Sequence, residues 1–232
     1  CYYLGNLWYD KKQYEMAFEC WQRSAELDED FPTVHRNLAL YYFNKKKDSD
    51  SARSHLEKAF ELDCGDARVL YELDQLYKKT GKAPDFRLEF LEKFREPVEQ
   101  RDDLYIEYVT LLNELGEYEQ ALDMLLNRKF HPWEGGEGKT TGQYVYCLIQ
   151  IARKYLQNEE YEKALETLDR ARTYPRNLGE GKLPTITDND INYFAGCALQ
   201  GLGRDEKAEQ MFNKACEGAD DLKMAIYYYD LP

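Results

Sequence analysis

The chain has 232 residues, of which 44 are acidic and 31 basic, so its formal net charge is −13. This excess of negative charge disfavours binding to nucleic acid, where neutralised phosphates supply much of the affinity, and binding to anionic membrane surfaces. An apolar content of 43% is enough for a folded core, while seven prolines and a charged fraction of 32% are typical of a helical protein.

The six cysteines form no C-x-x-C pair, and neither they nor the three histidines show zinc-ligand spacing. We therefore expect free thiols in a reducing, cytoplasmic compartment, and we expect no metal or other cofactor. No apolar run reaches the length of a membrane span. The chain begins at Cys1 inside a helical pattern, which suggests a piece of a longer protein.

A pattern of about 34 residues recurs along the chain. Each copy has a large, a small and an aromatic residue on a first helix, and Ala-x-x-x-aromatic on a second helix. The second-helix alanine positions are Ala17, Ala52, Phe86, Ala121, Ala164 and Ala208, with spacings of 35, 34, 35, 43 and 44 residues. The third copy fits least well, because Asp74 occupies its small position and Phe86 replaces its alanine.

This pattern predicts an all-α protein made of antiparallel helix pairs in one array. Small residues let the two helices of a pair approach closely, and the aromatic residues fill the gap to the next pair. The predicted repeats span residues 1–30, 31–64, 65–97, 98–128, 143–175 and 188–218, followed by a truncated seventh helix in 219–232. The apolar residues Met224, Ile226 and Tyr228 at this end predict self-association through an end.

Two inserted loops, residues 129–142 and 176–187, stretch the last two spacings. The segment HPWEGGEGK at 131–139 aligns without a gap on YPRNLGEGK at 174–182. The shared pairs are Pro132/Pro175, Gly136/Gly179, Glu137/Glu180, Gly138/Gly181 and Lys139/Lys182. Two interpretations stay open: Gly and Pro only let a long connection turn, or the loops carry binding groups.

A phosphate-binding loop is a poor interpretation of the first loop. Gly138, Lys139 and Thr140 match the end of G-x-x-x-x-G-K-[ST], but the first glycine of that motif falls on Trp133. No apolar strand precedes the segment, and the neighbouring Glu134 would repel phosphate. We therefore do not expect nucleotide binding.

With these repeats the chain resembles a tetratricopeptide repeat (TPR) array over nearly its whole length. The resemblance implies a right-handed superhelical solenoid whose first helices line a concave groove for peptides or other proteins, and it implies no catalysis. The loop sequences at 132–139 and 178–184 are similar to those of bacterial proteins that join such repeats to an amino-terminal, carbohydrate-associated β-sandwich domain of uncertain function. No β-sandwich lies in these 232 residues.

The resemblance implies two sets of candidate binding residues. In the groove, inward-facing first-helix positions are occupied by Tyr2, Asn6, Arg36, Tyr71, Gln75, Ile149, Arg153 and Tyr193. In the loops, an aromatic platform ringed by charges would comprise His131, Trp133, Glu134, Glu137, Lys139, Arg176, Glu180 and Lys182. No Ser/His/Asp or Cys/His constellation is present, so we expect no enzyme within this chain.

The leading hypothesis is a protein-interaction scaffold that binds a peptide, a partner protein or a neighbouring domain of its own chain. The groove and the twin loops would make these contacts. The alternative is an accessory arm of a carbohydrate-active or sugar-binding protein, in which the loops abut a neighbouring domain or contact carbohydrate.

Overall fold

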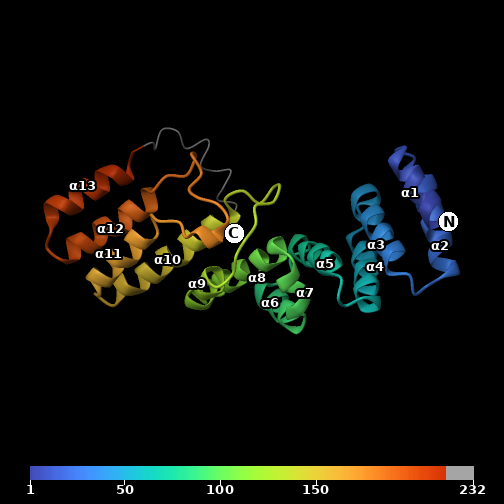
Figure 1. Ribbon diagram of the computed structural model, residues 1–232, viewed down its shortest axis with the longest axis horizontal. Coiled ribbons are helices and arrows are strands. Elements are labelled where there is room, and N and C mark those ends of the chain that lie inside the picture. Colours follow the sequence, from blue (N-terminus) through green and yellow to red (C-terminus); the bar gives the residue numbers. More distant parts are fainter. Residues whose placement is uncertain (218–232) are drawn as a thin grey trace. The chain divides into compact units, whose positions relative to one another are not determined.

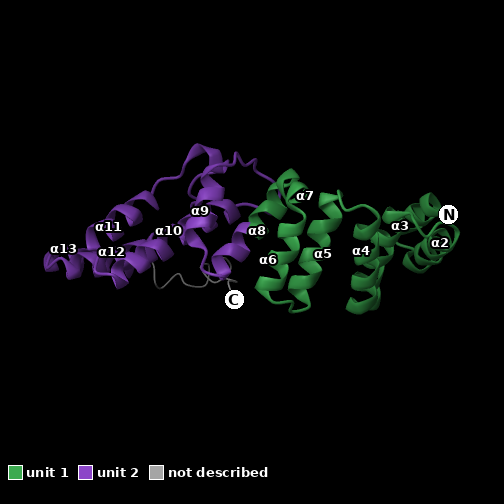
Figure 2. Cartoon of the chain, turned by 90° about the horizontal axis from the view of Figure 1, so that it is seen from below, with its two compact units in different colours: residues 1–108 green, residues 109–232 purple. Residues whose placement is uncertain are grey.

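The computed structural model describes residues 1–217, and Figure 1 shows them as a succession of helices. These residues form thirteen α-helices and contain no strand, which confirms the all-α prediction. The chain divides into two compact units, residues 1–108 and 109–232, and the boundary falls inside α8 (Asp102–Glu114) (Figure 2). The truncated seventh helix and the end contact predicted at Met224, Ile226 and Tyr228 lie outside the described residues.

Unit 1 consists of helix pairs joined by short turns. Its helices are α1 (Tyr2–Asp10), α2 (Tyr14–Leu27), α3 (Pro32–Tyr41), α4 (Ser49–Leu62), α5 (Ala67–Lys79), α6 (Pro84–Lys93) and α7 (Arg95–Gln100), followed by the first part of α8. A π-helical turn (Tyr42–Lys46) extends α3. Two of these helices have a side-chain N-cap. Asp48 accepts from the Ser51 N–H at the start of α4, and Asp66 accepts from the N–H groups of Arg68 and Val69 at the start of α5.

Unit 2 contains the rest of α8 and the two loop insertions. Its other helices are α9 (Tyr118–Leu126), α10 (Lys139–Gln157), α11 (Tyr161–Arg170), α12 (Asn189–Gly201) and α13 (Asp205–Ala215), with a 3-10 turn, η2 (Arg176–Leu178). The loop before α10 is shorter than the predicted 129–142 segment, because its last residues, from Lys139 on, form the first turn of α10.

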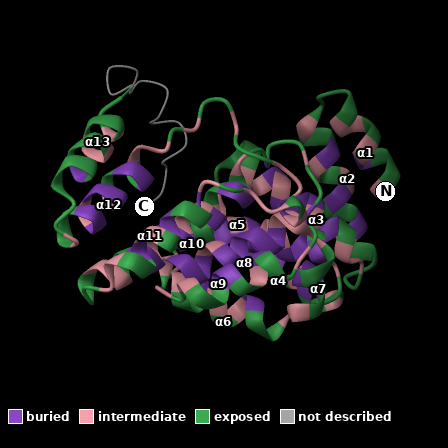
Figure 3. Cartoon of the chain, turned by 60° about the vertical axis from the view of Figure 1, so that its left-hand side comes forward, coloured by how far each residue is buried: buried purple, intermediate pink, exposed green. Residues whose placement is uncertain are grey.

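Small residues lie where the helices of a pair touch. Five of the predicted second-helix anchors are buried alanines: Ala17, Ala52, Ala121, Ala164 and Ala208. On the facing first helices, a Cβ added to Gly5 would lie 2.5 Å from the Trp21 ring, and one added to Gly196 would lie 2.5 Å from the Phe212 ring. The buried residues therefore follow the facing sides of the helices, as Figure 3 shows, and a larger residue at these positions would push the pair apart.

The third pair departs from this rule, and the predicted anchor there is wrong. Phe86 is 44% exposed, whereas its neighbour Arg87 is 3% exposed and faces Asp74, which is fully buried. Arg87 donates from Nε to Asp74 Oδ1 at 2.9 Å and from Nη2 to Oδ2 at 2.6 Å. Measured at Arg87, the spacing to Ala52 is 35 residues and that to Ala121 is 34. A buried ion pair thus joins α5 and α6 where other pairs use small residues.

Candidate functional site

The second loop of unit 2 holds the first loop in place. The Asn177 side chain donates from Nδ2 to the carbonyl oxygens of Leu125 (2.8 Å), Leu126 (3.3 Å) and Arg128 (2.8 Å) at the end of α9. The Phe130 N–H in turn donates to the Asn177 carbonyl at 2.7 Å. These bonds satisfy carbonyls that the end of a helix leaves unpaired. The loops therefore form one hydrogen-bonded assembly.

Glu180 caps the helix that follows the first loop. Both of its carboxylate oxygens lie 3.0 Å from the Gly138 N–H, and Oε1 also accepts from the Thr141 hydroxyl at 3.2 Å. A carboxylate at this place satisfies N–H groups at the start of α10 and complements the positive end of the helix dipole. Glu180 thus has a structural role that its aligned partner Glu137, which is exposed, does not share.

Glycines in the loops are required by backbone geometry. Gly138 and Gly179 have φ angles of +78° and +80°, in the region that favours glycine. A Cβ at Gly179 would also lie 2.7 Å from the Phe130 carbonyl oxygen, and a Cβ at Gly136 would collide with the Trp133 ring. Turning and close packing therefore explain these glycines without a ligand.

A cavity of about 260 Å³ lies where the loops meet the start of α10, and we call it the loop cavity. Its lining residues are His131, Pro132, Trp133, Glu134, Gly136, Glu137, Thr140, Leu178 and Glu180. Five of the eight predicted loop residues belong to this set. The three cationic ones do not: Lys139 and Arg176 are exposed, and Lys182 donates to Asp188 Oδ1 at 2.6 Å.

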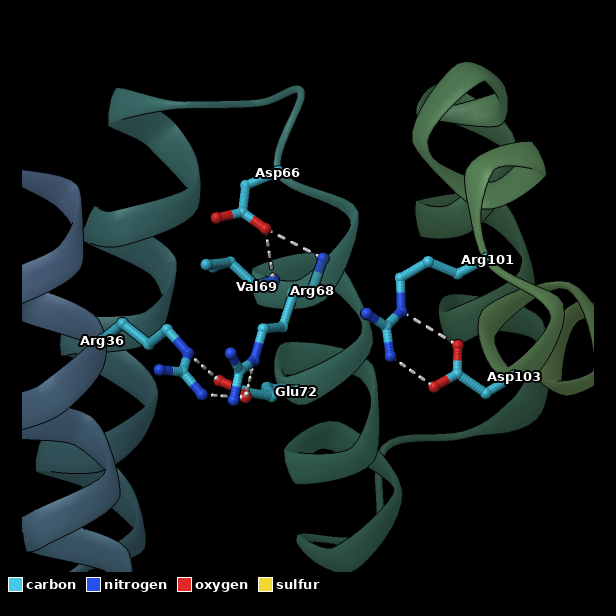
Figure 4. Close-up of polar contacts among 7 residues, drawn as sticks. All are labelled: Arg36, Asp66, Arg68, Val69, Glu72, Arg101 and Asp103. Carbon is cyan, nitrogen blue, oxygen red and sulfur yellow. Dashed lines mark hydrogen bonds and ion pairs between the residues drawn. The ribbon is translucent and has the colours of Figure 1, made fainter. Parts of the chain in front are cut away.

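In unit 1, Arg36, Glu72 and Arg68 form a charged network on α3 and α5, and Arg101 forms a separate pair with Asp103 (Figure 4). Arg36 of α3 makes a two-bond contact with the Glu72 carboxylate of α5, with Nε to Oε2 at 2.7 Å. Arg68 of α5 makes a single contact to the same carboxylate, at 3.3 Å. Arg101 makes a two-bond contact with Asp103, at 3.0 and 2.6 Å. Arg68 is therefore the one arginine of these three without a two-bond carboxylate partner.

Tyr71 links this network to Arg101, whose guanidinium lies 5.8 Å from the centre of the Tyr71 ring. Burial raises the pKa of Tyr71, and the nearby carboxylates of Glu107 and Asp103 add to this effect, so its hydroxyl remains a donor at neutral pH. We call the surface formed by Arg36, Arg68, Tyr71, Glu72 and Arg101 the arginine face. The sequence pattern did not point to Arg101, because this residue precedes α8 and occupies no first-helix position of the repeat.

Other predicted groove residues of unit 1 make internal contacts. The side-chain oxygen of Asn6, Oδ1, accepts from Trp21 Nε1 and from Asn37 Nδ2, each at 3.0 Å. Asn6 thereby connects α1 to α2 and α3. The Tyr2 ring packs edge-on against Phe31. Nε2 of Gln75 is shielded from solvent and has no hydrogen-bond partner among residues 1–217.

The predicted groove residues of unit 2 differ in exposure. Ile149 is buried in α10. Arg153 is exposed, and its guanidinium lies 5.4 Å from the centre of the Phe194 ring. Tyr193 is exposed on α12, where its ring contacts Phe212.

Comparisons with known proteins agree with the repeat pattern. A family model described as TPR repeat matches residues 5–46, and one described as tetratricopeptide repeat matches residues 190–217. Tetratricopeptide repeat sequence is thus present in these two segments. The match at 5–46 runs from within α1 to the end of the π-helical turn after α3, and the one at 190–217 runs from the start of α12 past the end of α13. The Asp74–Arg87 pair and both loops therefore lie outside the matched segments.

The solved structures with a similar fold include two with TM-scores above 0.5. One is MamA protein, with a TM-score of 0.53 and 19% identity over 88% of this chain and 98% of that chain. The other is YrrB, described as a TPR protein with an unusual peptide-binding site, with a TM-score of 0.56 and 19% identity over 92% of this chain and 100% of that chain. At this identity the likeness shows the fold alone.

No helix within residues 1–217 is long and apolar enough to cross a membrane. No cluster of three or more His, Cys, Asp or Glu side chains in that part of the chain could hold a metal ion.

Proposed function

We propose that this protein is a TPR interaction scaffold that binds an extended peptide on the arginine face of unit 1. The observation that carries the proposal is the state of Arg68, whose side chain is 62% exposed and has one contact to Glu72 at 3.3 Å. This contact uses Nε, so the two terminal guanidinium nitrogens of Arg68 can donate hydrogen bonds to a ligand. The proposal includes no catalytic step.

The neighbours of Arg68 hold it ready for a carboxylate. Glu72 is held by Arg36 through two bonds, so Arg68 is positioned by a carboxylate that another arginine already neutralises. An arriving acidic side chain could then form a two-bond pair with Arg68, which is the strongest contact that guanidinium and carboxylate groups make. The favoured peptide therefore carries a glutamate or aspartate.

Tyr71 supplies the second element of the face. Its ring is half-buried, and its hydroxyl is a hydrogen-bond donor at neutral pH. A ring beside arginines suits the backbone and apolar side chains of an extended peptide. The presence of TPR units and the fold shared with YrrB, a TPR protein with a peptide-binding site, support the peptide as the ligand class.

The test is an array of labelled extended peptides that each carry one central glutamate, alongside the same peptides with glutamine at that place. We expect a subset of the glutamate peptides to bind, and Arg68→Ala to weaken their binding about tenfold, as for one charge-assisted contact. The matched control is Arg23→Ala on α2, because Arg23 is 63% exposed and also pairs with a glutamate of its own helix.

Equal binding of glutamate and glutamine peptides, or equal loss in the two arginine variants, would contradict the proposal. So would an array without any binder. Binding of a glycan by the same surface, lost in Arg68→Ala, would instead favour the carbohydrate-associated role.

A further inference from the structure

We infer that the loop cavity of unit 2 is a second binding site, which receives the side chain of an arginine or lysine from a partner protein. The inference rests on the proposed function in one respect, that the ligand is a protein. The site is separate from the arginine face in its residues and opposite to it in the charge it would accept.

The size of the cavity limits the occupant. Its volume of about 260 Å³ is smaller than the cavities that hold drug-sized ligands. It has room for one long side chain or one small ring, and not for a folded segment. A single residue of a partner is therefore the unit to consider.

The charges of the lining select a cation. Glu134, Glu137 and Glu180 are in the lining, and it contains no lysine or arginine. Glu180 is already satisfied by the start of α10, whereas Glu134 and Glu137 are exposed and have no ion pair or hydrogen bond within residues 1–217. Two carboxylates at one cavity without internal partners favour a ligand that brings positive charge.

Trp133 provides the aromatic wall. Its ring lies directly against the backbone of Gly136, where an added Cβ would be 2.0 Å from Trp133 Cε2. The indole is thus held on one side by the backbone of its own loop. Tryptophan is the best aromatic partner for a guanidinium or ammonium group, and desolvation beside Pro132 and Leu178 strengthens such a contact.

The cavity is also pre-formed. Asn177 ties the second loop to the end of α9, and Glu180 ties it to the start of α10, so two independent sets of hydrogen bonds hold the walls. A binding site held in this way loses little conformational entropy when a ligand enters. The chain's net charge of −13 would further favour the approach of a basic partner.

A sugar is the competing occupant, since an aromatic ring beside carboxylates also suits a pyranose. A neutral sugar would leave the two exposed carboxylates uncompensated, whereas a guanidinium pairs with them. The charge of the lining therefore favours the basic side chain.

The experiment uses the whole chain labelled with ¹⁵N and follows the indole N–H signals of its three tryptophans, with the Trp133 signal assigned from the Trp133→Phe variant. The probes are N-acetyl-arginine amide, its neutral isostere N-acetyl-citrulline amide, and N-acetylglucosamine. We expect the arginine probe to shift the Trp133 signal in a saturable way that added salt weakens. We expect the other two probes to leave the signal unmoved.

Two double variants carry the same change of net charge. Glu134→Gln with Glu137→Gln removes the unpaired carboxylates of the cavity and should weaken binding of the arginine probe about tenfold. Glu166→Gln with Glu209→Gln removes two exposed carboxylates on α11 and α13 and should leave binding unchanged. All four glutamates are exposed, so folding should survive in both.

Three results would overturn the inference: no movement of the Trp133 signal, equal movement with the citrulline probe, or movement with N-acetylglucosamine alone. An equal effect of the two double variants would show that only the net charge of the chain matters, and would overturn it as well. The Arg68→Ala variant should titrate like the parent chain. The cavity and the arginine face can thus fail independently.

Discussion

The third repeat of unit 1 and the loop region of unit 2 both depart from the regular pattern, and they do so in different ways. In the third repeat the spacing is kept, but Asp74 and Arg87 replace the small residues between the helices. In unit 2 the alanines are kept, and extra residues are inserted between helix pairs. Within these insertions, Asn177 bonds to the end of α9 and Glu180 bonds to the start of α10.

The difference shows what each kind of departure requires. A charge placed inside a helix pair is shielded from water, so it needs partners close by, as Arg87 has in Asp74 and Glu107, and removal of a partner is costly. An inserted loop can satisfy helix ends at its edge and still leave other groups exposed, as Glu134 and Glu137 are. The charged pair inside the third repeat therefore matters most for stability, while the loop insertion leaves exposed carboxylates available for binding.

The largest expected effect is that of Asp74→Ala. This change leaves Arg87, which is 3% exposed, without its two-bond partner. We expect the free energy of unfolding of unit 1 to fall by about 3 kcal/mol, the lower end of the cost of breaking a buried ion pair, because Arg87 keeps a 3.3 Å contact to Glu107. Urea denaturation followed by circular dichroism measures it.

A double variant, Asp74→Leu with Arg87→Leu, controls this result, because it removes both charges of the pair together while Glu107 keeps its 3.3 Å contact to Lys78. We expect it to regain most of the loss. If the double variant is less stable than Asp74→Ala, the ion pair is a net source of stability. The large loss in Asp74→Ala would then not come from leaving Arg87 without its partner.

In unit 2, the largest loss should follow Asn177→Ala. Three carbonyl groups at the end of α9 lose their donor, and the free energy of unfolding should decrease by about 1–3 kcal/mol. Asn127→Ala is the control, since Asn127 directly follows α9, is exposed, and its side-chain amide donates to Asp123 of that helix. Equal thermal midpoints for the two variants would show that the second loop does not hold the first.

The two aligned glutamates should differ in their effect on stability. Glu180→Ala removes the cap of α10 and should cost about 1–2 kcal/mol, as other helix caps do. Glu137→Ala changes an exposed side chain and should stay within about 0.5 kcal/mol of the parent. Identical denaturation curves for both would mean that the twin loops do the same structural work, contrary to the hydrogen bonds of Glu180.

The smallest expected effect is the pH response of a second polar joint in unit 1, between α3 and α4. His35 Nε2 donates to the Glu29 carbonyl at 2.9 Å, so in the neutral pair His35 Nδ1 accepts from His55 Nδ1 at 3.1 Å. Burial lowers the pKa of His55 below its ordinary value of 6.5, and the neighbouring His35 adds to this. The unfolded chain therefore takes up the proton first as the pH falls.

The stability contributed by a neutral His55 is therefore fully present above about pH 6.5, the pKa of His55 in the unfolded chain. This stability is lost as the pH decreases from there through the pKa of His55 in the folded protein, which is lower. We expect the urea midpoint to decrease between about pH 7.5 and about pH 5.5, and to decrease less in His55→Phe. Equal slopes for the two proteins would show that protonation of His55 is not coupled to unfolding.

Much of the fold could be predicted from the sequence because its signals are local. Alternation of small and aromatic residues at helical spacing indicates helix pairs, and Gly5 against Trp21 shows the packing that this alternation encodes. The pattern failed at Phe86, since an aromatic residue looks like a better core residue than an arginine. Only the position of Asp74 on the facing helix identifies Arg87 as the buried one.

For the candidate sites, the sequence by itself determined that two loops share prolines, glycines, glutamates and lysines, and it identified Arg36 and Tyr71 as first-helix residues of a repeat. The tertiary structure decided what these residues do. Glu180 caps a helix that begins at Lys139, Lys182 binds Asp188, and Glu137 remains exposed at a cavity, although Glu180 and Glu137 are the same residue type at aligned positions. The physical reason is that a charged group takes its role from partners far away in the sequence, which a local pattern does not contain.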